Sequence, residues 1–303
     1  EIFDFIRCKD DPTKHWSTNI SVRVTDEFFE ALDNRDPHAN KVFEAVIDGM
    51  LKNGEPGFLN SSLANHGEAN PVRTSNPCGE IWLEGDGVST LEACCLGSIN
   101  MAAYPSQGDD IEPELLTAAR LMTRFLLRAT FADKFDDRMA NVINQNRRIG
   151  VGFTGLTEWY ASHGFKWTEA RHSRIIDRKL DLIAQAVREE ADSYAAQLDC
   201  NAPIKTMAIA PTGSISLLAG VTPSLQPPFA RYFIRRVRYS SDDPELQQHV
   251  GVHNIEPDIY SDNTSVVEIP MADTILDRYP DHLIQQSDEI SVDDFLGTQA
   301  FLQ

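Results

Sequence analysis

The chain has 303 residues, of which 42% are hydrophobic and 24% are charged, and its formal net charge is −19. This composition is ordinary for a globular protein with one large core or two modest ones. The acidity argues against a dedicated DNA- or RNA-binding surface, because phosphate contacts need clustered lysine and arginine, and only residues 231–239 are locally basic. A solvated acidic surface is the simplest interpretation, with adaptation to high salt as the alternative.

Membrane association and secretion are not indicated. No apolar run approaches the ~18 residues of a membrane span, and the first residues, EIFDFIRCKD, lack the layout of a signal peptide. Five cysteines without framework spacing indicate free thiols in a reducing compartment. We therefore expect a cytoplasmic protein that binds neither a membrane nor a nucleic acid polymer.

Helices are predicted at several places along the chain. Thr25 and Asp26 open a short one, with Asp26 in the N-cap pattern before DEFFEAL. Apolar residues spaced by three and four predict further helices over 38–54, 113–131 and 170–198, the first of which ends on a glycine.

Short β-leaning runs lie between these helices, at 19–24, 98–104, 206–210 and 264–269. Strands that alternate with helices predict an α/β fold with largely parallel strands, from which the polar residues 240–263 form an excursion. The chain starts within an apolar segment and stops inside what reads as a helix, so we expect a piece of a longer protein.

The stretch TSNPCGE places Asn76, Cys78 and Glu80 on alternate positions. In an extended segment these side chains project to one side, about 6–7 Å apart, and could face a ligand the size of a sugar ring. Pro77 fixes φ, and Gly79 lets the backbone approach a ligand closely. A neighbouring carboxylate disfavours the thiolate, which favours a thiol that transfers a hydrogen atom over a cysteine-hydrolase nucleophile. A polar turn with a buried cysteine is the alternative.

Two adjacent thiols, Cys94 and Cys95, follow in EACCLGSIN. Adjacent cysteines rarely form a stable disulfide, because the geometry is strained. The absence of CxxC leaves a four-ligand zinc site without support. The alternative to a functional thiol here is two small buried residues that enter a strand.

Two glycine-containing motifs come next. MAIAPTGSISLLAG (207–220) predicts a strand running into a turn whose hydroxyls and N–H groups could hold an anion at a helix N-terminus, although an ordinary glycine turn fits as well. It is not a Walker loop, because no Gly-Lys-Ser/Thr follows. GVGFTG (150–155) satisfies G-x-G-x-x-G, but NVINQNRR precedes it instead of an apolar strand. We expect tight backbone packing there, with a nicotinamide oxidoreductase as the alternative.

Taken together, these segments resemble the large, catalytic subunit of ribonucleotide reductase. The family's Asn-x-Cys-x-Glu motif is present at 76–80, and 94–100 is similar to its Cys-Asn-Leu-Gly-Ser-Ile-Asn segment, with Cys95 where asparagine is usual. Other similar segments follow the family's order, at 53–60, 69–75, 147–156 and 210–237.

The resemblance implies a fold: a ten-stranded α/β barrel of two five-stranded parallel halves, with a central finger loop that carries Cys78. Residues 1–303 would be a single partial catalytic barrel domain. The N-terminal regulatory and first-strand region, the C-terminal barrel end and the redox-active tail would be absent. Such a piece would not turn over alone, and a non-catalytic half of a split subunit is a related interpretation.

The resemblance also implies roles for the thiols and their neighbours. Cys78 would be the transient thiyl radical that takes the 3′ hydrogen of a ribonucleotide. Glu80 would be the base for the 3′ hydroxyl, and Asn76 would orient the ribose hydroxyls. Cys94 would be one half of the reducing dithiol. The other half would lie upstream of residue 1, because Cys8 falls in a different motif context.

Substrate contacts are implied for the whole 76–80 motif, including Pro77 and Gly79, and for a phosphate-binding loop. The loop residues are Pro211, Thr212, Gly213, Ser214, Ile215 and Ser216. No metal ligands are predicted.

Adenosylcobalamin is the cofactor that the Pro-Cys-Gly form of the motif favours; the iron- or manganese-dependent class with a separate radical-generating subunit is the rival. The implied partners are a ribonucleoside di- or triphosphate, a thioredoxin- or glutaredoxin-type reductant, the missing halves of the same subunit and a second copy in a homodimer.

Overall fold

The computed structural model describes residues 1–11, 14–15, 17–134 and 136–303. Its contacts divide the chain into two compact units. Unit 1 comprises residues 1–95, 127–149 and 195–208, and unit 2 comprises 96–126, 150–194 and 209–303.

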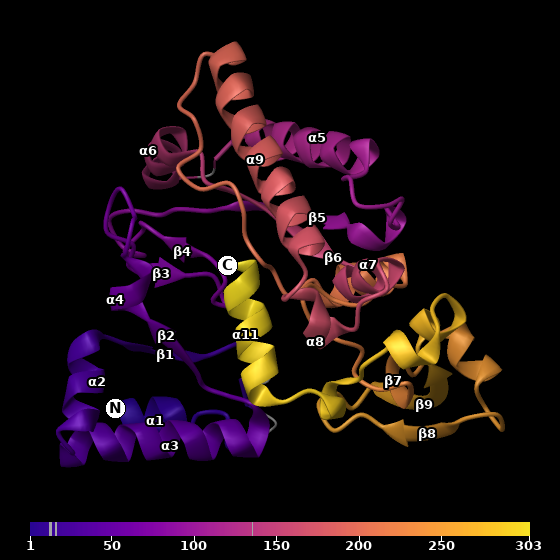
Figure 1. Ribbon diagram of the computed structural model, residues 1–303. Helices are drawn as coiled ribbons and strands as arrows, with labels where there is room; N and C mark the ends of the chain where they lie inside the picture. The colour runs from indigo at the N-terminus through magenta and orange to yellow at the C-terminus, as the bar shows by residue number, and fades with distance from the viewer. Residues whose placement is uncertain (12–13, 16, 135) are drawn as a thin grey trace. The chain divides into compact units, whose positions relative to one another are not determined.

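Helices and short strands alternate through both units (Figure 1). The α-helices are α1 (Ile2–Ile6), α2 (Asp26–Asp33), α3 (Pro37–Asn53), α4 (Ser61–Ala64), α5 (Pro113–Ala129), α6 (Asp137–Asn146), α7 (Leu156–Ser162), α8 (Trp167–Ala170), α9 (Arg174–Gln197), α10 (Gly213–Ala219) and α11 (Val292–Leu302). The strands are β1 (Ser21–Val24), β2 (Gly57–Asn60), β3 (Thr74–Ser75), β4 (Trp82–Leu83), β5 (Cys95–Asn100), β6 (Ile149–Thr154), β7 (Tyr232–Ser240), β8 (Asn254–Pro257) and β9 (Thr264–Ala272). The 3₁₀ turns are η1 (Met101–Ala103), η2 (Pro244–Gln248), η3 (Thr274–Asp277), η4 (Asp281–Leu283) and η5 (Ser287–Glu289).

Unit 1 contains a parallel strand pair. β1 pairs with β2, with Ser21 opposite Gly57, and α2 and α3 form the crossover that parallel neighbours require. One turn apart on α3, Val42 and Val46 are buried in one apolar cluster with residues of β1 and of α1. In the same unit, β3 and β4 form a short antiparallel hairpin.

The α3 helix shows why local signals predict helix ends well. The Asp36 side chain accepts hydrogen bonds from the N–H groups of His38 and Ala39, and Gly54 ends the helix in the left-handed conformation with φ of 85°. At α2 the expectation was wrong by one residue. Thr25, in extended conformation, is the N-cap residue, and Asp26 is already helical.

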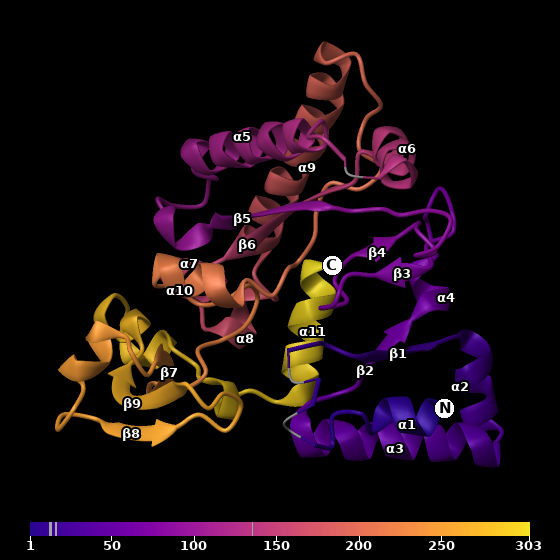
Figure 2. The same cartoon turned by 180° about the vertical axis from the view of Figure 1, so that it is seen from behind.

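Unit 2 contains long helices around a two-stranded sheet of β5 and β6, which lie mostly in this unit. α5 and α9 lie side by side in both views (Figures 1 and 2), and Arg124 of α5 donates a hydrogen bond of 2.5 Å to Glu190 of α9. Trp159 and Trp167 are completely buried in this unit. Its C-terminal part carries an antiparallel sheet in the order β7-β9-β8.

The predicted long helices are confirmed as α3, α5 and α9, but the strand predictions are confirmed only in part. β1 lies within its predicted run, and β9 covers the run 264–269 and continues to Ala272. Residues 98–104 are only half strand, because the Asn100 side chain accepts from Ala102 N–H and starts η1. Residues 206–210 form only a one-residue bridge at Met207, and 240–263 includes the edge strand β8.

The prediction of largely parallel strands is confirmed for β1 and β2 and wrong for the hairpin and the C-terminal sheet. β8 and β9 follow each other through the short segment 258–263, which cannot hold the crossover that parallel pairing needs, and β7 pairs antiparallel with the other edge of β9. No sheet among the described residues closes into a barrel. Within the same residues, no helix is both long and apolar enough to cross a membrane.

Candidate active site

The motif Asn-Pro-Cys-Gly forms the turn of the β3–β4 hairpin. The Gly79 N–H donates to the Asn76 carbonyl at 3.0 Å, and the Asn76 side-chain oxygen accepts from the Ile81 N–H at 3.1 Å. The expected extended arrangement is therefore wrong. Asparagine first, Pro77 second and glycine last is the preferred composition of a type I turn, and this turn chemistry prevails over extension.

Cys78 lies in the turn with its thiol exposed. Asn19, just before β1, donates from its side-chain amide to the Cys78 sulfur at 3.6 Å. The alternative of a buried cysteine in a polar turn is therefore wrong in its burial, although the turn itself is present. An exposed sulfur at a turn can be reached by a molecule outside the chain.

Glu80 directly follows the turn of residues 76–79, and its carboxylate carries an unsatisfied acceptor. Its Oε2 atom is buried and has no hydrogen-bond partner among the described residues. A buried polar atom without a partner costs about 1–3 kcal/mol, so such an atom in a native structure calls for an explanation. A ligand hydroxyl that donates to it would remove this cost.

Cys94 lies in the same unit, immediately before β5. Burial raises the pKa of its thiol to about 12, and Cys95 and the carboxylates of Glu92 and Glu80 act in the same direction, whereas Arg148 opposes them. The Glu80 carboxylate is thus close enough to Cys94 to act on its charge. Cys95 is the first residue of β5, but Cys94 and Cys95 are both only partly buried, so the alternative of two small buried residues that enter a strand is confirmed in position and not in burial.

The predicted phosphate loop, Pro211 to Ser216, lies in unit 2 and leads into α10. Thr212 is its N-cap residue in the left-handed conformation, with φ of 51°. Its hydroxyl accepts from Ser224 N–H at 2.7 Å and lies 3.3 Å from the Thr154 hydroxyl, and Ser216 Oγ donates to the Gly213 carbonyl. These two hydroxyls therefore shape the loop.

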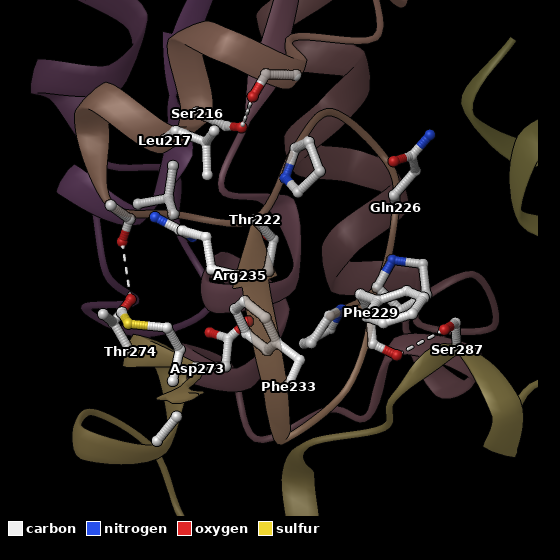
Figure 3. Close-up of a pocket in the computed structure, with 18 of the residues that line it drawn as sticks. Ser216, Leu217, Thr222, Gln226, Phe229, Phe233, Arg235, Asp273, Thr274 and Ser287 are labelled. Carbon is white, nitrogen blue, oxygen red and sulfur yellow. Dashed lines mark hydrogen bonds between the residues drawn. The ribbon is translucent and has the colours of Figure 1, made fainter. Parts of the chain in front are cut away.

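Other donors of the loop remain accessible. Gly213, Ser214 and Ile215 are exposed, and N–H groups in the first turn of a helix have no partner within the helix. Pro211 is exposed as well but has no N–H group to donate. A cavity of about 480 Å³ lies beside α10 (Figure 3). Ser216 and Leu217 of α10 line it, together with Phe229 and Phe233 from the segment that follows.

Other parts of the protein pack closely around the GVGFTG stretch. All six residues of β6 are buried, and Gly155 follows in the left-handed conformation. A Cβ atom on Gly155 would lie 3.0 Å from the Asn100 side-chain oxygen and 3.1 Å from the Ala102 Cβ atom. The expected tight backbone packing is confirmed, and a pyrophosphate has no space at this point.

The structure thus brings Asn76, Cys78 and Glu80 together on one turn and places Cys94 within electrostatic range of Glu80. Sequence reasoning missed Asn19, Glu92 and Arg148. Asn19 and Arg148 lie far in sequence from the thiols that they affect. Glu92 is close to Cys94 but looks like an ordinary polar residue, and no short motif marks any of the three. No group of three or more potential metal ligands occurs in the part of the chain that the structure describes.

Comparisons with known proteins show the family to which these residues belong. Residues 34–197 match the family model described as ribonucleotide reductase, barrel domain. A protein of Mycobacterium phage D29, provisionally named adenosylcobalamin-dependent ribonucleoside-triphosphate reductase, is 37% identical, with 100% of this chain and 46% of the relative covered. A Lactobacillus gasseri protein named adenosylcobalamin-dependent ribonucleoside-triphosphate reductase is 31% identical, with 99% and 41% covered.

Solved structures are similar as well. The crystal structure of a B12-dependent (class II) ribonucleotide reductase matches with a TM-score of 0.73 and 27% identity, over 99% of this chain and 43% of that one. The alpha subunit of a class Id ribonucleotide reductase from Actinobacillus ureae matches in fold, with a TM-score of 0.62 at 18% identity over 93% and 57%. The chain spans less than half the length of the curated relatives described here.

Proposed function

Because the chain belongs to the ribonucleotide reductase family through its barrel domain, we propose that it carries the radical site of an adenosylcobalamin-dependent reductase. The reaction is the reduction of a ribonucleotide to a 2′-deoxyribonucleotide by a dithiol. The names of the relatives support the adenosylcobalamin-dependent class over the class with a separate metal-containing subunit. They also support a triphosphate over a diphosphate as the substrate.

Adenosylcobalamin, when bound, supplies the radical that removes the hydrogen atom from a cysteine thiol. The exposed Cys78 thiol at the hairpin turn fits this chemistry, because it can be approached from outside the chain. We assign no residue of this chain to holding the cofactor. The Cys78 sulfur radical then takes the hydrogen atom from C3′ of the ribose, so that an S–H bond forms as the C–H bond breaks.

The observation that carries the proposal is the unpartnered, buried Oε2 atom of Glu80, two residues after the exposed thiol. It supports Glu80 as the base that accepts the proton of the 3′ hydroxyl. The Asn76 oxygen is engaged in the turn, which leaves its NH₂ group to orient the ribose hydroxyls. Pro77 and Gly79 complete the substrate wall through the turn backbone.

The reductive step uses Cys94 and a second protein thiol. Cys94 gives its proton to the departing 2′ oxygen, which leaves as water. The second thiol supplies the hydrogen that C2′ gains, and the two sulfurs close to a disulfide as their two electrons pass to the sugar. The Cys78 thiol returns its hydrogen atom to C3′. One C–O bond is replaced by a C–H bond as two thiols become one disulfide, so the electrons balance.

The substrate phosphates are proposed to bind at the turn that leads into α10 and at the first residues of this helix. The exposed backbone of Gly213, Ser214 and Ile215, together with the Ser214 hydroxyl, supplies donors there. Thr212 and Ser216 shape the loop through their internal hydrogen bonds, and Pro211 leads into it.

Further parts of the proposal concern the whole enzyme. Both units would belong to one catalytic domain, a ten-stranded barrel, and the TM-score of 0.73 to the class II structure supports this. A thioredoxin- or glutaredoxin-type protein would restore the dithiol in the cytoplasm, and a second copy would be a partner in a homodimer.

Replacement of Cys78 by serine tests the function. The relatives are more than twice as long, so the variant is made in the chain joined to the rest of its reading frame. Serine holds its hydrogen atom too strongly to form the radical. C78S should therefore abolish deoxyribonucleotide formation with adenosylcobalamin and a dithiol, while nucleotide affinity stays nearly unchanged.

The matched control is Cys8→Ser, which removes a thiol outside the motif and should retain turnover. Turnover by C78S at the unaltered rate would refute the radical role. Loss of nucleotide binding together with loss of fold would mark Cys78 as a structural thiol.

A further inference from the structure

A buried polar network surrounds Glu92, two residues before Cys94, entirely within unit 1. The Glu92 side chain has no exposed surface, and its carboxylate accepts three hydrogen bonds from two separate segments. The Glu84 N–H donates at 2.6 Å, the Asn146 side-chain amide at 3.0 Å and Arg148 Nε at 3.1 Å.

These contacts connect the two thiol-bearing segments of the candidate site. Glu84 directly follows β4, the second strand of the hairpin that carries Cys78 and Glu80. The Asn146 amide also donates to the Glu84 carboxylate at 2.8 Å. Glu92 therefore fixes the residues before Cys94 against the base of the hairpin.

Among the described groups named as acting on the charge of Cys94, Arg148 is the positive one, and two carboxylates neutralise it. Its guanidinium bonds Glu92 at 3.1 Å and Glu68 at 3.1 Å, and its side chain is 5% exposed. A guanidinium alone beside a thiol favours the thiolate, because opposite charges attract. The other groups named as acting on the charge of the Cys94 thiol are Cys95, Glu92 and Glu80.

We propose that Glu92 and Arg148 are a positioning pair for the buried Cys94 thiol: their ion pair holds the residues before Cys94 against the base of the hairpin, and Glu92 offsets the charge of Arg148 there. The inference rests on the proposed function, in which Cys94 must deliver a proton to the departing 2′ oxygen. A thiolate at this point would have no proton to give.

Opposite changes in the reactivity of Cys94 test the pair. Glu92→Gln leaves the Arg148 charge less compensated, so more thiolate forms; Arg148→Gln leaves the carboxylates uncompensated, so less forms. A change of one unit in the thiol pKa changes the thiolate fraction tenfold. The alkylation rate changes by only about three- to fourfold, because a thiolate of lower pKa is also a weaker nucleophile. The Cys94 alkylation rate with iodoacetamide at pH 8.5 should rise by about this factor in E92Q and fall by it in R148Q.

The measurement is made on this chain in a Cys95→Ser background, with Cys94 modification followed by peptide mass spectrometry. Lys205→Gln is the matched control. Lys205 bonds the same Glu68 at 3.3 Å but is not among the groups that act on Cys94, so its rate should stay unchanged. Arg148→Lys keeps the charge and should keep the rate of the unaltered chain.

A merely structural network gives a different result. Loosened packing would expose Cys94 and raise the rate in both E92Q and R148Q, and that outcome, or no change in either, overturns the inference. If R148Q does not fold, the rise in E92Q against the unchanged R148K carries the test. The proposed function fails separately, if Cys94→Ser in the full-length protein still sustains multiple turnovers.

Discussion

Gly79 is the residue on which the shape of the candidate hairpin turn depends. Its φ of 80° lies in the left-handed region, which side chains other than glycine rarely adopt. A Cβ atom at this position would also lie 2.9 Å from the Leu59 Cδ2 atom of β2. The conformation therefore requires glycine here, and a larger residue would also displace the end of the Leu59 side chain.

Gly79→Ala should lower the free energy of unfolding by about 1–3 kcal/mol, because the backbone strain and the contact with Leu59 add. Gly67→Ala is the matched control, since Gly67 has a φ of 74° but no atom within 4 Å of its Cβ position. Denaturant titration of both variants isolates the steric part as the difference between them. Equal losses would show that Leu59 moves aside freely.

Single residues of the site could be predicted where a local motif carried them. Asn76, Pro77 and Gly79 signal a turn by their order alone, although we expected extension. The partner of Cys78 could not be predicted, because Asn19 lies 59 residues before it and looks like any polar residue at a strand start. The unpartnered Glu80 oxygen is a property of the packing around it, which no spacing expresses.

At the scale of elements, the α9 helix carries a lysine on its buried face. Lys179 has no exposed surface, and its ammonium group lies 2.9 Å from each of the Glu112 carboxylate, the Gly108 carbonyl and His163 Nε2. Burial, and then Lys179, lower the pKa of His163, so its imidazole is neutral and accepts from the lysine. These bonds attach the segment before α5 to the α9 helix.

Lys179→Met should destabilise unit 2 by about 3–5 kcal/mol, because it leaves the buried Glu112 carboxylate without its counter-charge. The control is Arg178→Met on the same helix, whose pair with Asp110 spans 3.9 Å between side chains that are 67% and 96% exposed. That loss should stay below about 1 kcal/mol. Thermal or denaturant unfolding measures both, and equal losses would contradict a special role for the buried pair.

Helices could be predicted from the sequence better than strands, for a physical reason. The apolar spacing of α3, α5 and α9 is contained within each helix, and Gly54 marks an end by its own conformation. A strand needs a partner elsewhere in the chain. The run at 206–210 has the composition of a strand but forms only one bridge, and nothing local to 264–269 shows that its partner would be the antiparallel β7.

The whole molecule carries 46 acidic and 27 basic side chains, which gives the net charge of −19. Like charges on a compact surface repel each other, and this repulsion lowers the stability of the folded state. Salt shortens the range of the repulsion from about 30 Å at 0.01 M to about 10 Å at 0.1 M. The surface ion pairs weakened at the same time contribute little.

Addition of sodium chloride from about 0.01 to 0.5 M should therefore raise the midpoint of thermal unfolding by about 2–5 °C. Circular dichroism measures the midpoint. The same titration near pH 4.7, the sequence pI, is the control, because the net charge and hence the salt effect should be close to zero there. A midpoint that falls with salt at neutral pH would show that attractive pairs dominate.

The exposure of Cys78 has a consequence for the working life of the protein. A sulfur that outside molecules can reach is equally open to peroxide, and oxidation beyond the sulfenic acid cannot be undone by ordinary reductants. The turn that presents this atom would keep its shape after such damage, so a preparation could lose its chemistry while its spectrum and melting curve stay the same. The number of unoxidised thiols per chain, measured by thiol titration, is therefore the appropriate measure of the quality of a preparation.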